Sequence, residues 1–180
     1  MASSRKKYLP HNLERHFPYL TRNVYEVKSR PTPRYNCIAF AAGDRTRWWE
    51  PDIYGIYYWP PHAKREYTLV GYIQAFEAVG YEQCKDDNYQ YERGFEKVAI
   101  YYTLIGNPHI PPGSPTHAAL QLDNGIWMSK LGPWHDIQHL NLDCLNGDDR
   151  TGITRPYGQP VQVLKGQFSE WVKPVKIATI

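Results

Sequence analysis

The chain lacks long apolar runs and has only three cysteines. It contains no stretch of the roughly 18 consecutive apolar residues needed to cross a bilayer, and its opening residues MASSRKKYLPHN lack the apolar core of a signal peptide. We therefore expect a cytoplasmic protein with no membrane partner. Cys37, Cys84 and Cys144 are odd in number and far apart, so we expect no disulfide scaffold.

The chain also has little excess of charge of either sign. The 21 Lys and Arg residues and 18 Asp and Glu residues give a formal net charge of +3, and the basic residues are spread along the chain. Without a concentrated basic face there is nothing to follow a phosphate backbone, so we expect no nucleic-acid partner. A length of 180 residues with 42% hydrophobic residues predicts one core in one domain, and we expect a monomer.

Aromatic residues, in contrast, are abundant. The chain has 15 Tyr and 6 Trp, and several of them are clustered with prolines between Trp48 and Trp59. Such a segment is typical of the rim of a cleft or a contact surface, and on this basis Trp48, Trp49 and Trp59 are candidate substrate-binding residues. The alternative is that these rings pack in the interior.

The pattern of apolar residues predicts a mixed fold. Residues 1–34 are polar and contain several prolines, and we interpret them as an arm packed on a single domain of residues 35–180. Apolar positions spaced by three and four predict an amphipathic helix over 68–79 that ends at Gly80. Strands are predicted at 97–104, 117–122, 125–130 and 161–164.

Two further segments complete the predicted order. Asp-Asn-Gly at 123–125 predicts a tight hairpin with a two-residue turn at Asn124-Gly125. Residues 136–145 are predicted to form a short helix capped by Asp136. Helices that precede a set of antiparallel strands indicate the α+β class.

Cys37 and His117 form the candidate catalytic pair. Asn36 is a good N-cap residue for a short apolar helix over 37–42, which places Cys37 in the first turn. A helix N-terminus and a neighbouring imidazolium both lower the pKa of a thiol. His117 begins a strand, and Ser129 near the end of the next strand is the candidate that orients its ring, with Asp136 and His139 as alternatives.

Each of these residues also has an ordinary structural interpretation. A cysteine in an apolar helix is usually a small buried hydrophobic residue, and a histidine at a strand start is usually structural. Asp136 is typical of an N-cap. A zinc site built from His135, Asp136, His139 and Cys144 would match no strong ligand spacing, so we predict no metal and no cofactor.

Longer motifs resemble a known superfamily. YNCIAFAAGD resembles the cysteine-bearing helix of papain-like thiol hydrolases, and THAALQLDNGIWMSK is similar in layout to the histidine hairpin of their NlpC-like branch. Together with RWWEP, YWPP and SKLGPWHDIQH, these motifs resemble a group of small bacterial domains of unknown function. The resemblance covers residues 31–165, roughly.

The resemblance implies a papain-like fold, in which the cysteine-bearing helix packs on a small antiparallel sheet. It also implies a cysteine-dependent hydrolase of the peptidase or amidase type that acts on an amide or ester bond. Cys37 would attack the carbonyl, His117 would act as base and then acid, and the N–H groups of Asn36 and Cys37 would stabilise the oxyanion. Deamidation and acyl transfer use the same pair and stay open. The alternative is a catalytically inactive module of the same shape that binds a peptide or protein.

Overall fold

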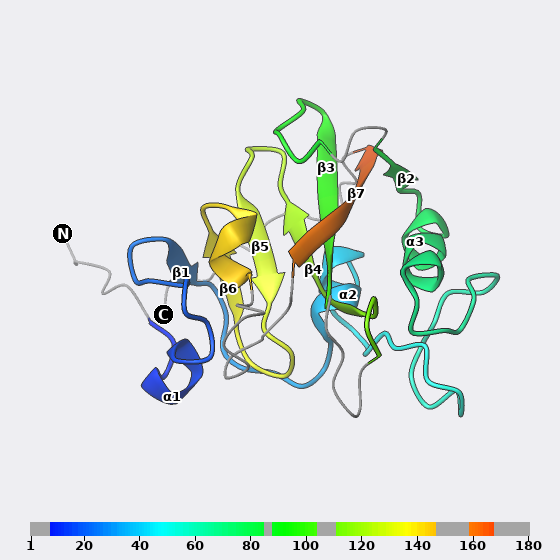
Figure 1. Cartoon of the computed structure of the whole chain (residues 1–180), viewed down its shortest axis with the longest axis horizontal. Coiled ribbons are helices and arrows are strands. Elements are labelled where there is room, and N and C mark those ends of the chain that lie inside the picture. The colour runs from blue at the N-terminus through cyan, green and yellow to red at the C-terminus, as the bar shows by residue number, and fades with distance from the viewer. Residues whose placement is uncertain (1–7, 85–87, 104–110, 147–158, 168–180) are drawn as a thin grey trace.

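The computed structural model describes residues 8–84, 88–103, 111–146 and 159–167. In the last of these ranges, side chains are described only for residues 163–165. Within these ranges the strands form one sheet in the order β1-β6-β5-β4-β3-β7-β2 (Figure 1). The strands are β1 Tyr25–Val27, β2 Glu82–Gln83, β3 Phe95–Tyr102, β4 Pro115–Gln121, β5 Trp127–Lys130, β6 Asp136–His139 and β7 Gln159–Gln167. The helices are α1 His11–Glu14, α2 Cys37–Ala41, α3 Leu69–Glu77 and the 3-10 turn η1 Leu142–Leu145. Every neighbouring pair in the sheet is antiparallel, so the α+β prediction is confirmed.

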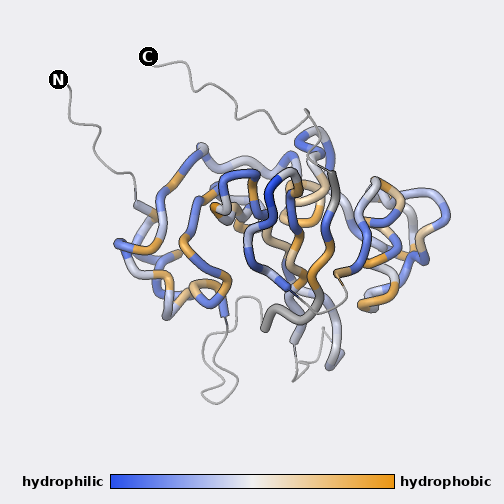
Figure 2. The backbone as a smooth tube through the Cα atoms, turned by 90° about the horizontal axis from the view of Figure 1, so that it is seen from above, coloured by the Kyte–Doolittle hydropathy of each residue, from blue (hydrophilic) through white to orange (hydrophobic). Residues whose placement is uncertain are grey.

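The sheet has a hydrophobic cluster on each face, because successive strand side chains point to opposite faces. On β4, Ala118 and Leu120 belong to the cluster that includes α2 and α3, whereas Ala119 belongs to the other cluster. The second cluster is completed by η1 and by apolar residues of the N-terminal segment, including Leu13 and Phe17. In Figure 2 the backbone is hydrophobic along parts of the central strands and hydrophilic in most connecting loops.

Helix α3 confirms the helix predicted over 68–79. The Thr68 hydroxyl caps it by accepting a hydrogen bond from the Gly71 amide at 3.2 Å, and Tyr72 and Phe76 are buried on its inner face. Gly71 lies against the preceding segment, because a Cβ there would be 2.7 Å from the Glu66 carbonyl oxygen and 2.9 Å from that of Lys64. The helix and the loop before it are therefore packed without space for a methyl group.

Replacing Gly71 by alanine is expected to destabilise the domain. In an ordinary helix this change stabilises by about 1 kcal/mol, but here two backbone carbonyls must move, and we expect a net loss of about 1–3 kcal/mol. Urea unfolding measures the difference. Val70→Ala in the same helix, at a half-exposed position, is the control and should change stability by less than about 1 kcal/mol. A Gly71→Ala variant as stable as the wild type would contradict the close contact.

The helix predicted over 136–145 is wrong. Residues 136–139 form β6, which pairs with both β1 and β5, and Ile137 is fully buried on one side of the sheet. Asn141 then begins η1, where its side chain accepts a hydrogen bond from the Cys144 amide at 3.1 Å. The partner strand β1 is more than a hundred residues away in the chain, so local spacing could not reveal it.

The segment interpreted as an arm contributes to the sheet. Its residues 25–27 form the edge strand β1 beside β6, and the Lys28 amide donates a hydrogen bond to the Asp136 carbonyl at 2.8 Å. The strand predicted at 161–164 is confirmed as part of β7. None of the helices in the described ranges has the length and apolar character that a membrane crossing requires.

The predicted hairpin is present, with a loop one residue longer than expected. The Leu122 amide donates to the Ile126 carbonyl at 2.9 Å, so residues 123–125 form the loop, with Gly125 at a φ of 81°. This register places Ser129 directly opposite Ala119. Because side chains two residues apart share a face, Ser129 can still reach the His117 ring diagonally.

Candidate functional site

Cys37 is the first residue of α2, as predicted. The Asn36 side chain caps this helix by accepting a hydrogen bond from the Ala39 amide at 3.1 Å. The side-chain nitrogen of Asn36, Nδ2, also donates to the Trp49 carbonyl at 2.7 Å. The cap therefore ties the aromatic segment to the cysteine-bearing helix, which packs against β4 and β5.

The pKa of the Cys37 thiol is raised, the opposite of the expected direction. Burial raises it to about 11, and the amides of Ala118, Ile38 and Cys37 together with the charge of Lys130 oppose this only in part. The side chain is 8% exposed. The dehydration of a thiolate at this position outweighs the helix N-terminus, so the sulfur is protonated at neutral pH.

His117 is fully buried and begins a chain of hydrogen bonds. Its Nε2 lies 3.0 Å from the Ser129 Oγ, which lies 2.9 Å from the His139 Nε2, and the His139 Nδ1 lies 2.8 Å from the Asn141 carbonyl oxygen. We call His117, Ser129 and His139 the imidazole relay. Ser129, predicted to orient His117, thus contacts its ring, and His139, one of the alternatives, extends the chain.

The direction of the relay follows from its last bond. A carbonyl only accepts, so the His139 Nδ1 donates to Asn141 and the Nε2 of a neutral His139 ring is an acceptor. The Ser129 hydroxyl therefore donates to His139 and accepts from the Nε2 of His117. In neutral His117 the lone pair is then on Nδ1.

Both rings of the relay are neutral. Burial lowers the pKa of His139 to about 4, and the hydrogen bond to Asn141 offsets this only in part. Burial first, and then the nearby His139, hold the pKa of His117 well below its usual value. Neutral rings agree with the donor and acceptor assignment derived above.

The thiol and the His117 ring lie on opposite faces of β4. The Cys37 sulfur interacts with the amide of Ala118, and both residues belong to the cluster of α2 and α3. The His117 ring meets Ser129 and packs edge-on against Tyr101, with ring centroids 5.3 Å apart. Tyr101 belongs to the other cluster. The two predicted partners thus lie on either side of β4, with the thiol beside Ala118 and the His117 ring directed away from α2.

Asp136 lies with Lys130 and Tyr35, away from the His117 ring. Its Oδ2 accepts a hydrogen bond from the Tyr35 hydroxyl at 2.8 Å, and it is paired with Lys130 across the ladder. The Lys130 ammonium donates to the carbonyls of Thr32, at 2.8 Å, and Trp134. Burial lowers the pKa of Lys130 to about 8, although Asp136 and Cys37 raise it. From the sequence, Ser129 and Lys130 are expected at an exposed strand end, whereas both are fully buried.

The cluster considered for zinc is used for other contacts. His139 is part of the imidazole relay, and the Cys144 sulfur donates to the Asn141 side chain at 3.1 Å. Within the described ranges no group of three or more His, Cys, Asp or Glu side chains is arranged to hold a metal ion.

The three predicted tryptophans are mainly packing residues. Trp49 and Trp59 are 2% and 5% exposed and belong to the core cluster. Their indole N–H groups donate to the Asp44 carboxylate and the Lys64 carbonyl, both at 2.9 Å. Trp48 is half-buried and donates to Glu50. The interior alternative therefore describes Trp49 and Trp59.

The exposed residues of this segment lie between the tryptophans. Ile53, Tyr54 and Ile56 are 78%, 82% and 73% exposed. We call residues 53–56 the apex of the loop. Single exposed apolar residues are ordinary, but several large ones in one short segment are a feature of interaction surfaces. The sequence hinted at them only through the general excess of aromatic residues nearby.

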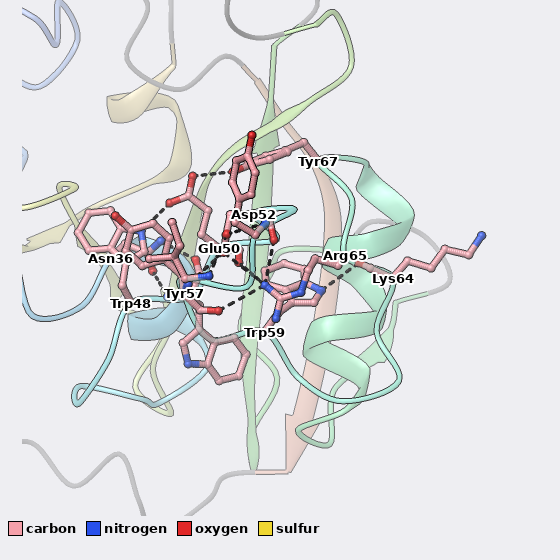
Figure 3. Close-up of polar contacts among 12 residues, drawn as sticks. Asn36, Trp48, Glu50, Asp52, Tyr57, Trp59, Lys64, Arg65 and Tyr67 are labelled. Carbon is pink, nitrogen blue, oxygen red and sulfur yellow. Dashed lines mark hydrogen bonds and ion pairs between the residues drawn. The ribbon is translucent and has the colours of Figure 1, made fainter.

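Two charged residues hold the base of the apex, and we call Asp52 and Arg65 the clamp. The Asp52 carboxylate accepts hydrogen bonds from the amides of Tyr54, Ile56 and Tyr57 at 2.9–3.1 Å. Arg65 donates to the Asp52 carboxylate and to the carbonyls of Asp52 and Tyr57 (Figure 3). Burial acts to raise the pKa of Asp52, but these amides and Arg65 lower it overall.

Fold and site together define an α+β domain with a seven-stranded antiparallel sheet in its described part, a buried imidazole relay and a clamped apolar loop. The chain belongs to the family described as Domain of unknown function (DUF7689), whose model matches residues 26–165. This agrees with the expected resemblance to domains of unknown function. No curated protein and no solved structure matches the chain.

Proposed function

We propose that this domain is a protein-binding module whose contact element is the loop around the apex. The observation that carries the proposal is the exposure of Ile53, Tyr54 and Ile56 on a loop whose base is held by the clamp. Ordered loops that present large apolar side chains to solvent are typical of contact surfaces. The module is the inactive alternative to the hydrolase, on a scaffold that the resemblance describes as papain-like.

The environment of Cys37 supports binding over catalysis. A nucleophilic cysteine needs a thiolate fraction near neutral pH, and a pKa of about 11 leaves about one thiol in ten thousand ionised at pH 7. The His117 ring, on the other face of β4, is engaged by Ser129. Both features favour a structural role for the two residues.

A cysteine-dependent hydrolase of the peptidase or amidase type is the second candidate, and two observations favour it. The sulfur interacts with the amide of Ala118, the residue after His117, and the relay leaves the lone pair of His117 on Nδ1, the atom that would accept a proton from the thiol. Catalysis would require the ring to turn toward α2, away from Ser129 and Tyr101. A peptide or protein is the substrate that the resemblance implies.

Alkylation by iodoacetamide distinguishes the two candidates. Under the binding proposal, Cys37 reacts slowly at pH 7, no faster than the buried Cys144 and more slowly than the partly exposed Cys84. Its rate should rise about tenfold per pH unit toward pH 11, because only the thiolate reacts. Peptide mass spectrometry gives the rate at each cysteine.

His117→Ala is the decisive variant in this experiment. The binding proposal predicts an unchanged alkylation rate at Cys37 in the folded variant, with Cys84 as the internal standard. The hydrolase is supported instead if Cys37 reacts faster than the other two thiols near neutral pH and His117→Ala removes that preference. That outcome would overturn the inactive module.

A further inference from the structure

We infer that the partner of the apex is a folded protein with an uncharged, concave apolar pocket, into which Ile53, Tyr54 and Ile56 insert. This inference rests on the proposed function, because it specifies the partner of the same loop. It is carried by the preformed backbone of the apex, by the charge balance around it and by its shape.

The apex is preformed for contact. The amides of Tyr54, Ile56 and Tyr57 donate to the Asp52 carboxylate, and the Gly55 amide donates to the Asp52 carbonyl at 3.3 Å. Gly55 has a φ of 67°, which only glycine adopts readily. Because these N–H groups are already bonded, removing water from the apex leaves none of them without an acceptor. Binding then also requires little ordering of the loop, which favours affinity.

The charges around the apex cancel. Residues 44–67 contain the four cations Arg45, Arg47, Lys64 and Arg65 and the four anions Asp44, Glu50, Asp52 and Glu66. Arg47 pairs with Asp44 at 2.7 Å and Arg65 with Asp52 at 3.3 Å. A neutral surround disfavours an anionic lipid surface, because membrane attachment through a few apolar side chains ordinarily needs electrostatic attraction as well. It favours a pocket without charge, because a charged group in the pocket would be buried in the complex with no partner of opposite charge.

The shape of the apex disfavours an extended peptide as its ligand. Peptides are held in grooves or along free strand edges, whereas the apex is a tight turn that projects from its own base. Arg65 joins the two ends of this turn, because it donates to both Asp52 and Tyr57 (Figure 3). A projecting turn is complemented by a concavity, and a stable concavity belongs to a folded protein.

The surround of the apex extends the contact area. Tyr57 and Tyr67 are 41% and 44% exposed, and the Tyr67 hydroxyl donates to Glu50 at 2.8 Å, which fixes its ring. Tyrosine side chains that are held in place are common at the centres of protein interfaces. They would lie beside the inserted side chains and add to the contact, toward the area of ~800 Å² per partner that stable complexes bury.

A photo-crosslinking amino acid in place of Tyr54 tests the inference in the full-length chain. In cells that naturally produce the protein, benzoylphenylalanine at this position should give a discrete protein adduct, which benzoylphenylalanine in place of Tyr89 should not. Tyr89 is 58% exposed and lies outside the loop. The captured protein is then purified and titrated by calorimetry with the wild-type chain and its variants.

Ile53→Ser with Ile56→Ser should weaken binding of the purified partner about 100-fold or more, because the two isoleucine side chains that the complex would bury are lost. Asp52→Ala should weaken it about tenfold by loosening the turn, with the fold checked by circular dichroism. Tyr89→Ser should change affinity less than about twofold. Equal affinity of the wild type and the double isoleucine variant would overturn the inference.

Other outcomes separate the inference from the proposed function. If synthetic linear fragments of the captured protein bind as tightly as the folded protein, the folded pocket is wrong but the binding module stands. Apex-dependent sedimentation with phosphatidylcholine and phosphatidylglycerol vesicles, or an apex-dependent dimer in light scattering, would replace the pocket by a lipid surface or a second copy. Absence of any adduct, vesicle binding or dimer would overturn the proposed function itself.

Discussion

Acidification from pH 7 to pH 4 is expected to lower the free energy of unfolding by about 3 kcal/mol through His139 alone. The pKa of His139 falls from 6.5 to about 4 on folding. At about 1.4 kcal/mol per pH unit, this difference amounts to about 3 kcal/mol. His117, whose pKa is also lowered by burial, adds to the loss.

The sign follows from which state binds the proton. Below pH 6.5 the unfolded chain protonates its histidines, whereas the folded relay stays neutral until the pH approaches 4. Protons therefore pull the equilibrium toward the unfolded state, and stability is lost as the pH falls through this window. Above pH 7 the contribution should be constant.

Guanidinium unfolding at several pH values between 7 and 4.5 measures this dependence. His139→Gln, which keeps an acceptor for Ser129 but does not titrate, should be clearly less pH-dependent than the wild type. The exposed His16→Gln is the matched control and should keep the wild-type slope. If His139→Gln and the wild type have the same slope, His139 is not a neutral buried residue.

The relay illustrates what sequence could predict about the site. Asn36 as N-cap, Cys37 in the first turn and contact between Ser129 and His117 all followed from local patterns and the hairpin. The face of each side chain did not. A strand has a period of two, so a shift of one residue moves a side chain across the sheet, and Ala118 rather than His117 faces α2.

Other features could not be predicted because they depend on contacts outside the local sequence pattern. The sequence indicated an exposed contact segment around Trp48 to Trp59, but Trp49 is buried because Asn36 and Asp44 bind its polar groups. The apex is exposed because Arg65 holds Asp52 thirteen residues away. Helix α3, by contrast, was predictable because its buried face and its cap are both local.

Ser129→Ala is expected to destabilise the domain by about 2–6 kcal/mol while changing its volume little. The hydroxyl accepts from the Nε2 of His117 and donates to the Nε2 of His139, and all three residues are 0–1% exposed. Its removal takes a partner from two buried ring nitrogens, and each such loss costs about 1–3 kcal/mol.

A double-mutant cycle with His139→Leu shows whether the cost belongs to the relay. Once His139 is leucine, the Ser129 hydroxyl has lost its acceptor, so Ser129→Ala should cost about 1–3 kcal/mol less than in the wild type. Nitrogen NMR adds an independent readout, because the relay requires the proton on Nδ1 of His139 and on Nε2 of His117. Additive effects in the cycle, or the opposite tautomer at His139, would mean that Ser129 does not join the two rings.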